Sequence, residues 1–374
     1  MASLTLHGVR KEYGQVVALD SLDLDVRDGE FFVLLGPSGA GKTTTLKCVA
    51  GLEGLSAGRV EIGGRDVTDA EPNSRHVAMA FENYALYPQY TVYDNIAFPL
   101  RSPRYRVSAQ EATSRIDRVT TTLGINQLLE RAPRELSGGQ RQRVALARVL
   151  VRPADVLLLD EPLSHLDAKL RAAMRTELKS LGDLQHTTSL YVTHDYLEAL
   201  ALGDRIAVLR EGKLVQVGTR EEMWHQPVDL FVAQAFGQPR INLVLGEIVR
   251  TDRGQAFRDQ DGAFVIPLGD VDVPAQRSVW LGLRPRDLVL GESTGMHPLQ
   301  GRVYVVETLG RQLEVTVDVG AQRISLVVPR TEIEPDTMVT FSVPPHRLLL
   351  FDAASERRLE MAPAVGHQAG ASHV

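Results

Sequence analysis

The segment from Gly36 to Thr43 has the composition of a phosphate-binding loop. It reads GPSGAGKT, matches the pattern G-x-x-x-x-G-K-[ST], and lies between the apolar run FFVLL (31–35) and a helical stretch. Glycines let backbone N–H groups converge on phosphate oxygens, and the helix end adds partial positive charge. Lys42 is expected to reach the β- and γ-phosphates, and Thr43 to ligate Mg²⁺. The residues expected to bind ATP here are Gly36, Ser38, Gly39, Gly41, Lys42, Thr43 and Thr44.

Carboxylates follow a second apolar run, VLLLDE (156–161). If this run is a buried parallel strand, Asp160 and Glu161 stand at its carboxyl end, where ligands bind in open α/β sheets. Asp160 is expected to hold Mg²⁺, and Glu161 to orient or deprotonate the attacking water. His194 ends another apolar run, SLYVTH (189–194), and is expected to hydrogen-bond the γ-phosphate or the water. The alternatives are an acidic surface turn and a histidine with a purely structural role.

A second glycine-rich segment, LSGGQ (136–140), also begins a helical stretch. Ser137 and Gln140 stand in the S-x-x-Q relation of a capping box, and Gly138 and Gly139 leave that helix end without bulky side chains. An open amino end of a helix is an anion site. Because the first loop surrounds the phosphates from one side, we expect this segment to close over them from the other. The alternative is an ordinary capped helix, which requires the serine but not the two glycines.

The remaining pattern predicts the elements that position these groups. The first 30 residues alternate between apolar and polar positions, which predicts antiparallel strands. Apolar runs then alternate with helical stretches, which predicts a mainly parallel sheet covered on both sides. A hairpin is expected to turn at Glu211 and Gly212. After FGQPRIN (236–242), short alternating segments with few helical signals predict an all-β barrel or sandwich.

Length and composition limit the possible classes of protein. The chain has 374 residues, 44% of them hydrophobic and 24% charged, which predicts a soluble protein of two domains. No apolar run approaches the length of a membrane span, and the amino end does not resemble a secretory signal. The formal net charge of −6 argues against broad nucleic-acid binding. The single cysteine, Cys48, excludes an internal disulfide and is expected to be a small apolar residue on a helix.

The segments GPSGAGKTT, LSGGQ, VLLLDEP, LSHLD and YVTHD, in this order and spacing, resemble the ATP-binding cassette family of transporter ATPases. The resemblance covers roughly residues 3–235. It implies an α/β P-loop cassette with a mainly parallel sheet, an antiparallel N-terminal β part and a helical subdomain. It also implies a homodimer, in which the LSGGQ helix of one subunit covers ATP held by the phosphate loop of the other. Ser137, Gly138, Gly139 and Gln140 would then contact nucleotide across the dimer.

Other roles also follow from the resemblance. Tyr13 matches the aromatic residue that stacks on adenine, and Asp167 belongs to the loop that links the two sites of the dimer. Members usually carry Asn at the position of His165. They also usually carry Gln at the position of Glu82, where the side chain contacts Mg²⁺ and water. A carboxylate at Glu82 removes a hydrogen-bond donor and adds negative charge near the phosphates, so we expect tighter Mg²⁺ binding or altered basal turnover.

The C-terminal part resembles the oligonucleotide/oligosaccharide-fold regulatory extension of the maltose-type importer ATPases. The matching segments are LGLRPRDL (281–288) and VVETLGRQLEV (305–315). The expected domains are the cassette at 1–236, with its helical subdomain at about 85–155, the β domain at 237–356, and a flexible tail at 357–374.

The resemblance implies a subunit that couples ATP hydrolysis to solute uptake. Its expected partners are a second copy of the chain, two transmembrane permease subunits and an external solute-binding protein. Its expected location is the cytoplasmic face of the inner membrane, where it would be peripheral. A sugar is the leading solute, and polyamine, iron and sulfate are the alternatives within this class.

Two further classes of protein remain open. One is a cassette ATPase of translation or DNA repair, with the barrel as a nucleic-acid module, but the chain has one cassette and no long helical insertion. The other is a non-hydrolysing scaffold. Its weakness is that all the expected catalytic residues are present, namely Lys42, Asp160, Glu161 and His194.

Overall fold

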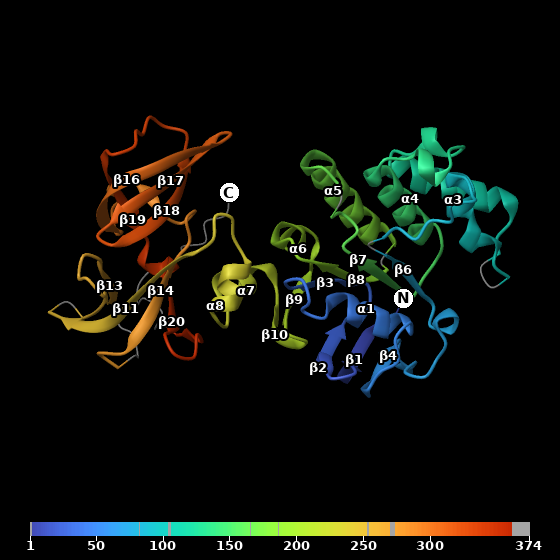
Figure 1. The fold of residues 1–374 in the computed structure, drawn as a ribbon, viewed down its shortest axis with the longest axis horizontal. Helices are drawn as coiled ribbons and strands as arrows, with labels where there is room; N and C mark the ends of the chain where they lie inside the picture. Colours follow the sequence, from blue (N-terminus) through green and yellow to red (C-terminus); the bar gives the residue numbers. More distant parts are fainter. Residues whose placement is uncertain are drawn as a thin grey trace, which may run out of the picture. The chain divides into compact units, whose positions relative to one another are not determined.

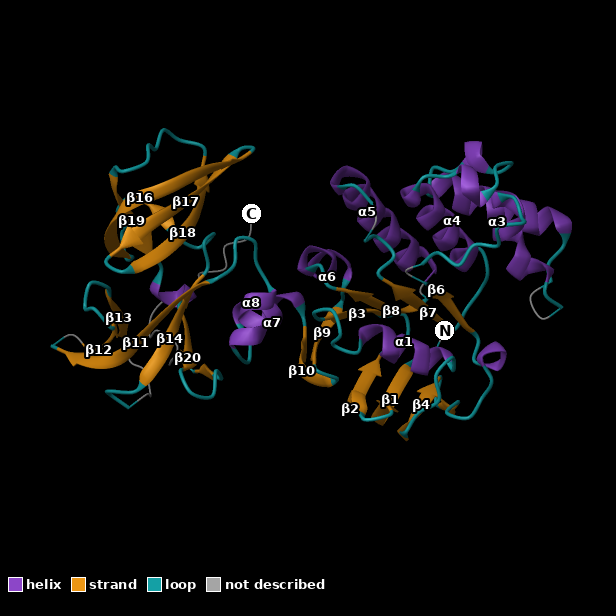
Figure 2. Ribbon diagram, in the orientation of Figure 1, coloured by secondary structure: helices purple, strands orange, loops and turns teal. Residues whose placement is uncertain are grey.

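The computed structural model describes residues 2–81, 83–103, 106–164, 166–185, 187–252, 254–269 and 274–360. The chain divides into two compact units, Met1–Arg220 and Glu221–Val374. Strands and helices alternate in the first unit, whereas strands dominate the second (Figures 1 and 2).

Two sheets form the framework of the first unit. The N-terminal sheet is antiparallel, in the order β2-β1-β4-β5. A six-stranded sheet has the order β10-β9-β3-β8-β7-β6, and its strands are parallel except for the β9–β10 hairpin. The strands are β1 (Leu4–Tyr13), β2 (Val16–Val26), β3 (Phe31–Leu35), β4 (Ala57–Ile62), β5 (Arg65–Asp66), β6 (Val77–Ala80), β7 (Val156–Asp160), β8 (Thr188–Thr193), β9 (Arg205–Arg210) and β10 (Lys213–Gly218).

The helices of the first unit lie against these sheets and against one another. In Figure 1, α1 lies between the two sheets, and α5 and α6 lie on the opposite side of the larger one. Helix α4 contacts both α2 and α3, inside the range predicted for a helical subdomain. The helices are α1 (Lys42–Ala50), α2 (Val92–Ala97), α3 (Ala109–Thr122), α4 (Gly138–Leu150), α5 (Ala168–Gln185) and α6 (Tyr196–Leu202), with 3-10 turns η1 (Pro72–Ser74), η2 (Phe98–Arg101), η3 (Asn126–Leu128) and η4 (Pro133–Glu135).

The core of this unit explains the continuous apolar runs in the sequence. Every residue of β3 and β7 is buried, because helices or the N-terminal sheet cover both faces of these central strands. Cys48 lies in the same core, and burial raises the pKa of its thiol to about 11. The hairpin turns at Glu211 and Gly212 as predicted, with φ of 50° and 77° respectively.

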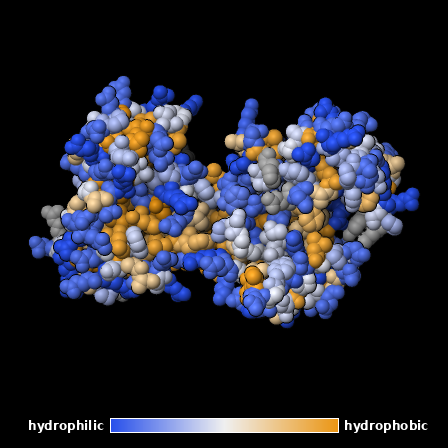
Figure 3. Space-filling view, in the orientation of Figure 1, coloured by the Kyte–Doolittle hydropathy of each residue, from blue (hydrophilic) through white to orange (hydrophobic). Residues whose placement is uncertain are grey.

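In the residues that the structure describes, the second unit contains two antiparallel sheets and two short helices. The sheets have the orders β13-β12-β11-β14-β20-β21 and β15-β19-β16-β17-β18, and one apolar core draws residues from both. On the face drawn in Figure 3, apolar residues gather over β11 and β14. The elements are α7 (Arg220–His225), α8 (Leu230–Ala235), β11 (Asn242–Thr251), β12 (Gly254–Asp259), β13 (Val265–Gly269), β14 (Ser278–Leu283), β15 (Val289–Leu290), β16 (His297–Leu309), β17 (Gln312–Val319), β18 (Gln322–Pro329), β19 (Met338–Val343), η5 (Pro345–Arg347), β20 (Leu349–Asp352) and β21 (Arg358–Leu359).

The structure differs from the predicted domain ends at two places. The division falls after Arg220, whereas the sequence analysis places the boundary at 236, so that α7 and α8 belong to the second unit. The prediction of a flexible tail from 357 onwards is wrong at its start. The backbone at Val228 and Leu230 hydrogen-bonds to that of Arg358 and Glu356, which ties this end of the chain down. Residues 361–374 lie outside the described ones.

Arg284 joins α7 and α8 to the β domain. Its Nη1 donates to the Phe236 carbonyl and its Nη2 to the Trp224 carbonyl, both at 2.7 Å. The guanidinium also lies 4.0 Å from the centroid of the Trp224 ring. Burial lowers the pKa of Arg284 to about 10, which leaves it charged at neutral pH. A buried, chelating arginine explains why these helices associate with the strands that follow them.

We predict that Arg284→Met destabilises the second unit by about 2–3 kcal/mol, because two carbonyl groups lose a charged donor. Both tryptophans, Trp224 and Trp280, lie in this unit, so urea unfolding followed by tryptophan fluorescence reports on it alone. The matched control is Arg286→Met, at an exposed arginine two residues away, with an expected effect below about 0.5 kcal/mol. Equal urea midpoints for the two variants would contradict the assignment.

Candidate functional site

The phosphate loop is shaped by two close backbone approaches that only glycine permits. A Cβ atom on Gly36 would lie 2.5 Å from the Leu209 carbonyl oxygen. A Cβ atom on Gly41 would lie 2.7 Å from the Ala18 carbonyl oxygen, and φ at Gly41 is 103°. The backbone therefore folds tightly at both ends of the loop. Between them, Ser38 and Gly39 are exposed, so the side of the loop expected to face the phosphates is open.

The amino end of α1 supplies hydrogen-bond donors to this loop. The first backbone bond of the helix runs from Thr45 N to Gly41 O at 2.9 Å. The N–H groups of Lys42, Thr43 and Thr44 therefore precede the helical ladder and have no intrahelical acceptor. Three such groups, together with the helix dipole, make an anion site.

Lys42 places its ammonium group at the centre of the site. The side chain is 5% exposed, and Nζ donates to the carbonyls of Gly36 and Pro37 at 3.0 Å each. Nζ also lies 3.6 Å from Glu161 Oε1. The loop carbonyls and this carboxylate hold the cation where the sequence predicts the β- and γ-phosphates.

Thr43 and Asp160 fit a Mg²⁺ site. Thr43 Oγ1 donates to Asp160 Oδ1 at 3.0 Å, and the Asp160 side chain, at the end of β7, is 3% exposed. A hydroxyl and a carboxylate side by side are oxygen ligands of the kind Mg²⁺ takes, with water and phosphate oxygens as the usual remaining ligands. The third predicted metal ligand, Glu82, lies outside the described residues.

Glu161 has a strained backbone that turns its carboxylate into the site. Its φ is 44°, in the left-handed region that few residues other than glycine adopt. The strain is compensated by hydrogen bonds at both backbone groups: Glu161 N donates to Val192 O at 3.1 Å, and its carbonyl accepts from Ser164 Oγ at 3.0 Å. The carboxylate lies between Lys42 and His194, with 2.8 Å between Oε2 and His194 Nδ1.

Gln142 is a residue at this site that the sequence analysis missed. It belongs to α4, its side chain is 4% exposed, and Nε2 donates to the Glu161 carbonyl at 3.5 Å. Within the described part of the chain, its Oε1 has no hydrogen-bond partner. One signal was available: Gln142 stands one helical turn before the buried Leu146, so a polar residue occupies the apolar face of the helix.

The LSGGQ segment forms the predicted capping box. Gln140 N donates to Ser137 Oγ at 3.3 Å, and Ser137 N donates to Gln140 Oε1 at 2.9 Å. A Cβ atom on Gly138 would meet nothing closer than 3.9 Å, whereas one on Gly139 would lie 3.1 Å from Leu166 Cδ2. Gly138 therefore keeps the helix end open, and Gly139 permits close packing. Contact of this segment with a nucleotide stays a prediction.

Tyr13 and Asp167 lie at exposed positions. Tyr13 is 43% exposed at the end of β1, with Lys11 Nζ 4.7 Å from its ring centroid. Asp167 caps α5, because its Oδ1 accepts a hydrogen bond from Leu170 N at 2.9 Å. Stacking of Tyr13 on adenine stays a prediction, and so does the role of Asp167 in linking the two sites of a dimer. His165 lies outside the described residues.

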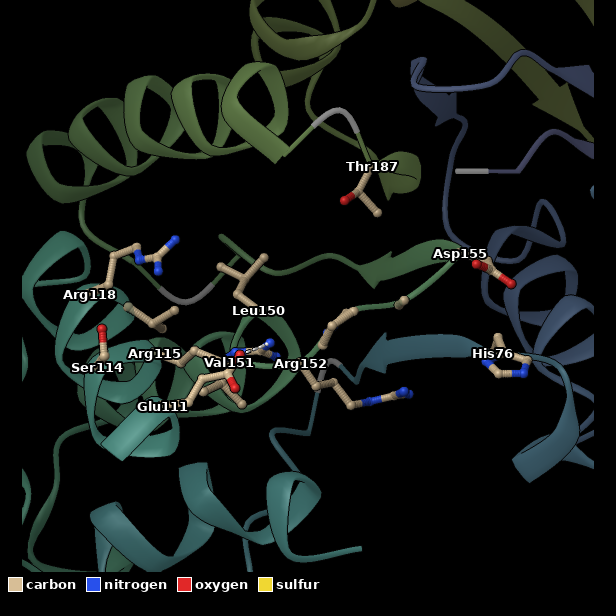
Figure 4. A pocket seen from close by; sticks show the side chains of 13 residues that line it. His76, Glu111, Ser114, Arg115, Arg118, Leu150, Val151, Arg152, Asp155 and Thr187 are labelled. Carbon is tan, nitrogen blue, oxygen red and sulfur yellow. Dashed lines mark hydrogen bonds and ion pairs between the residues drawn. The ribbon is translucent and has the colours of Figure 1, made fainter. Parts of the chain in front are cut away.

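A cavity of about 560 Å³ lies at the other edge of the larger sheet (Figure 4). His76, Asp155 and Thr187 line it, and each directly precedes a parallel strand. Lys42 and His194, by contrast, follow the carboxyl ends of their strands. The cavity is therefore separate from the predicted phosphate site, which lies at the carboxyl edge of the sheet, where ligands bind in open α/β sheets.

Comparison with known proteins agrees with this geometry. The ABC transporter family profile matches residues 19–164, and the TOBE domain profile matches residues 281–351. The chain is 41% identical over 372 residues to the maltose/maltodextrin import ATP-binding protein of Vibrio cholerae, covering 98% of this chain and 99% of that one. It is 43% identical over 364 residues to the sulfoquinovosyl glycerol transport ATP-binding protein of Agrobacterium fabrum, covering 96% and 100% respectively.

A solved structure extends the comparison to the fold. A dimeric ATP-binding cassette in a post-hydrolysis state, with ADP and Pi bound, superposes with a TM-score of 0.54 at 29% identity, covering 58% of this chain and 98% of that one. The predicted cassette fold, followed by an all-antiparallel β domain, is confirmed. Among the described residues, no helix has both the length and the apolar character needed to cross a bilayer.

We predict that Lys42→Met weakens nucleotide binding about tenfold or more, because the ammonium group at the centre of the site is lost. A titration with a fluorescent ATP analogue measures the affinity. Lys47→Met, on the same helix, is the matched control and should bind as the parent does. Unchanged affinity in the Lys42 variant would show that the phosphates bind elsewhere.

Proposed function

This chain belongs to the ABC transporter family, and from that premise we propose that it is the ATP-hydrolysing subunit of a solute importer. The observation that carries the proposal is the position of the Glu161 carboxylate between Lys42 and His194, beside the Thr43–Asp160 pair. A scaffold that binds nucleotide without hydrolysing it has no need for a carboxylate held in a strained backbone at this place.

The site residues divide the work of hydrolysis. Lys42 and the amino end of α1 neutralise the phosphate chain, and bound Mg²⁺ would add further positive charge at the phosphate oxygens. Glu161 orients the water and accepts its proton as the oxygen attacks the γ-phosphorus. The bond to the β–γ bridging oxygen breaks, and ADP and phosphate leave. His194 holds the carboxylate on one side, and it is positioned to hydrogen-bond the γ-phosphate.

The second half of each site is proposed to come from another copy of the chain. The amino end of α4 carries a satisfied cap at Ser137 and an open Gly138, which suits an anion approaching along the helix axis. In a head-to-tail dimer, this end would cover the γ-phosphate held by the partner's loop. The solved cassette with ADP and Pi is itself dimeric, which supports this arrangement.

The proposed solute is a sugar or a sugar derivative. The names of the two relatives compared above refer to maltose/maltodextrin import and to sulfoquinovosyl glycerol transport, and each relative matches almost the whole of this chain. Two permease subunits and an external solute-binding protein would complete the importer, with this chain at the inner face of the membrane. No observation favours the polyamine, iron or sulfate alternatives.

The experiment that tests hydrolysis is the substitution Glu161→Gln. We expect the ATPase rate to fall about 10²-fold or more, since the proton acceptor is lost, while ATP binding remains. In the presence of ATP, this variant should then accumulate as a dimer, which size-exclusion chromatography detects. Glu177→Gln, the same change on α5, serves as control and should retain activity. Near-parental hydrolysis by the Glu161 variant would refute the proposed role.

A separate prediction concerns Glu82, which stands where the family usually has Gln. We propose that its carboxylate strengthens Mg²⁺ binding, so Glu82→Gln should raise the half-saturating Mg²⁺ concentration for ATPase activity severalfold. Glu82→Asp, which keeps the charge, should stay closer to the parent. Identical ATPase rates and Mg²⁺ dependence in the parent and the Gln variant would discard this role.

A further inference from the structure

Buried polar side chains hold the end of β8, the strand that precedes His194. Glu198, on α6, is 3% exposed. Its Oε2 atom accepts hydrogen bonds from Tyr191 Oη at 2.8 Å and from Thr193 Oγ1 at 2.7 Å. Burial raises the pKa of Glu198, whereas the two hydroxyl donors lower it. Glu198 therefore fixes the backbone immediately before His194.

The residue after His194 is fixed as well. Asp195 N donates to Thr193 Oγ1 at 3.0 Å. Asp195 Oδ1 accepts from Leu197 N at 2.8 Å and so caps α6. Because both neighbours of His194 are hydrogen-bonded in this way, the direction of the imidazole depends on how this turn is held.

Arg171, on α5, joins this turn to a different loop. Its Nη1 donates to Asp195 Oδ2 at 3.4 Å, and its Nε lies 4.0 Å from Glu198 Oε1. On the other side, Nη2 donates to the carbonyls of Leu166 at 3.1 Å and Ser164 at 3.5 Å. One guanidinium thus contacts both the turn after β8 and the loop after β7.

These contacts close a ring around the reacting groups. Ser164 Oγ donates to the Glu161 carbonyl, and the Glu161 carboxylate contacts His194. Asp195 follows His194 in the chain, and Arg171 hydrogen-bonds both to the Asp195 carboxylate and to the Ser164 carbonyl. A shift of either loop would therefore change the relation between the carboxylate and the imidazole.

We propose that Arg171 is a positioning residue for ATP hydrolysis, which locks the loop of Ser164 to the turn that carries His194. The inference rests on the proposed function, because it gives Arg171 a role only if Glu161 and His194 act on ATP. A planar guanidinium suits this role, because it donates in several fixed directions at once, which an ammonium group does not. Displacements of about 1 Å at reacting groups cost on the order of 10²-fold in rate.

The alternative is that Arg171 serves stability alone. Kinetic measurements distinguish a positioning role from a purely stabilising one, because loss of a positioning residue affects the chemical step more than it affects ATP binding. The phosphate loop, which binds the nucleotide, is not among the contacts of the Arg171 side chain described above. Loss of positioning should therefore lower kcat and leave KM for ATP nearly unchanged.

The test is steady-state ATPase kinetics of the full-length chain carrying Arg171→Met. We expect kcat to fall about tenfold or more and KM to stay within about twofold of the parent. Arg171→Lys should recover only part of the loss. Arg175→Met is the matched control: it lies one turn along α5, and its side chain makes no hydrogen bond or ion pair with the described residues. Thermal unfolding of each variant shows whether the chain stays folded.

A second variant covers the case in which Arg171→Met does not fold. Asp195→Asn keeps the oxygen that caps α6 and weakens the contact with Arg171, so its kcat should fall severalfold with unchanged thermal stability. Parental kcat in the folded Arg171 variant, or in Asp195→Asn if the former does not fold, would overturn the inference. If the parent chain itself hydrolysed no ATP, the proposed function would fail instead, and the two failures are thereby distinguished.

Discussion

The meeting of parallel strand ends at one edge of a sheet is the constraint on which this site depends. Strand β8 lies between β3 and β7 and is hydrogen-bonded in parallel to both, so the residues that follow these three strands converge. Lys42, Asp160, Glu161 and His194 come from distant parts of the chain and become partners for this reason. The left-handed backbone at Glu161 then brings its carboxylate between the ammonium group and the imidazole. The ammonium group of Lys42, the carboxylate proposed as proton acceptor and the Thr43–Asp160 pair proposed to hold Mg²⁺ thus lie side by side.

Contacts outside the reacting groups preserve this arrangement. The backbone of Glu161 is held from β8, from the loop that follows it and from Gln142 on α4. Gln142 lies on the same helix whose capped amino end is proposed to cover the partner's nucleotide. In the proposed dimer, a movement of α4 would change the contact between Gln142 and the Glu161 carbonyl of the same chain, and we propose this contact as a link between the two sites.

Local sequence patterns were sufficient to predict most of this fold, and they singled out side chains that the structure brings together at the amino end of α1. The buried strand β3, the capping box at Ser137 and the carboxylates after β7 each have a signature within a few residues. The boundary between the units could not be predicted in this way, because α7 and α8 are held to the β domain by Arg284, whose partners lie 48 and 60 positions earlier in the chain. The same holds for the pairing of residues 228–230 with 356–358 and for Gln142 beside Glu161. Spacing along the chain carries no information about such contacts.

The claim that a second copy completes each site is tested most directly by mixing two inactive variants. Glu161→Gln lacks the proton acceptor, and Ser137→Arg blocks the helix end; each alone should hydrolyse ATP poorly. In a mixed dimer, one composite site receives both defects and the other receives neither. The account predicts that mixing the two proteins restores a substantial part of the ATPase rate. A mixture as inactive as its components, under conditions where mixed dimers are shown to form, would contradict it.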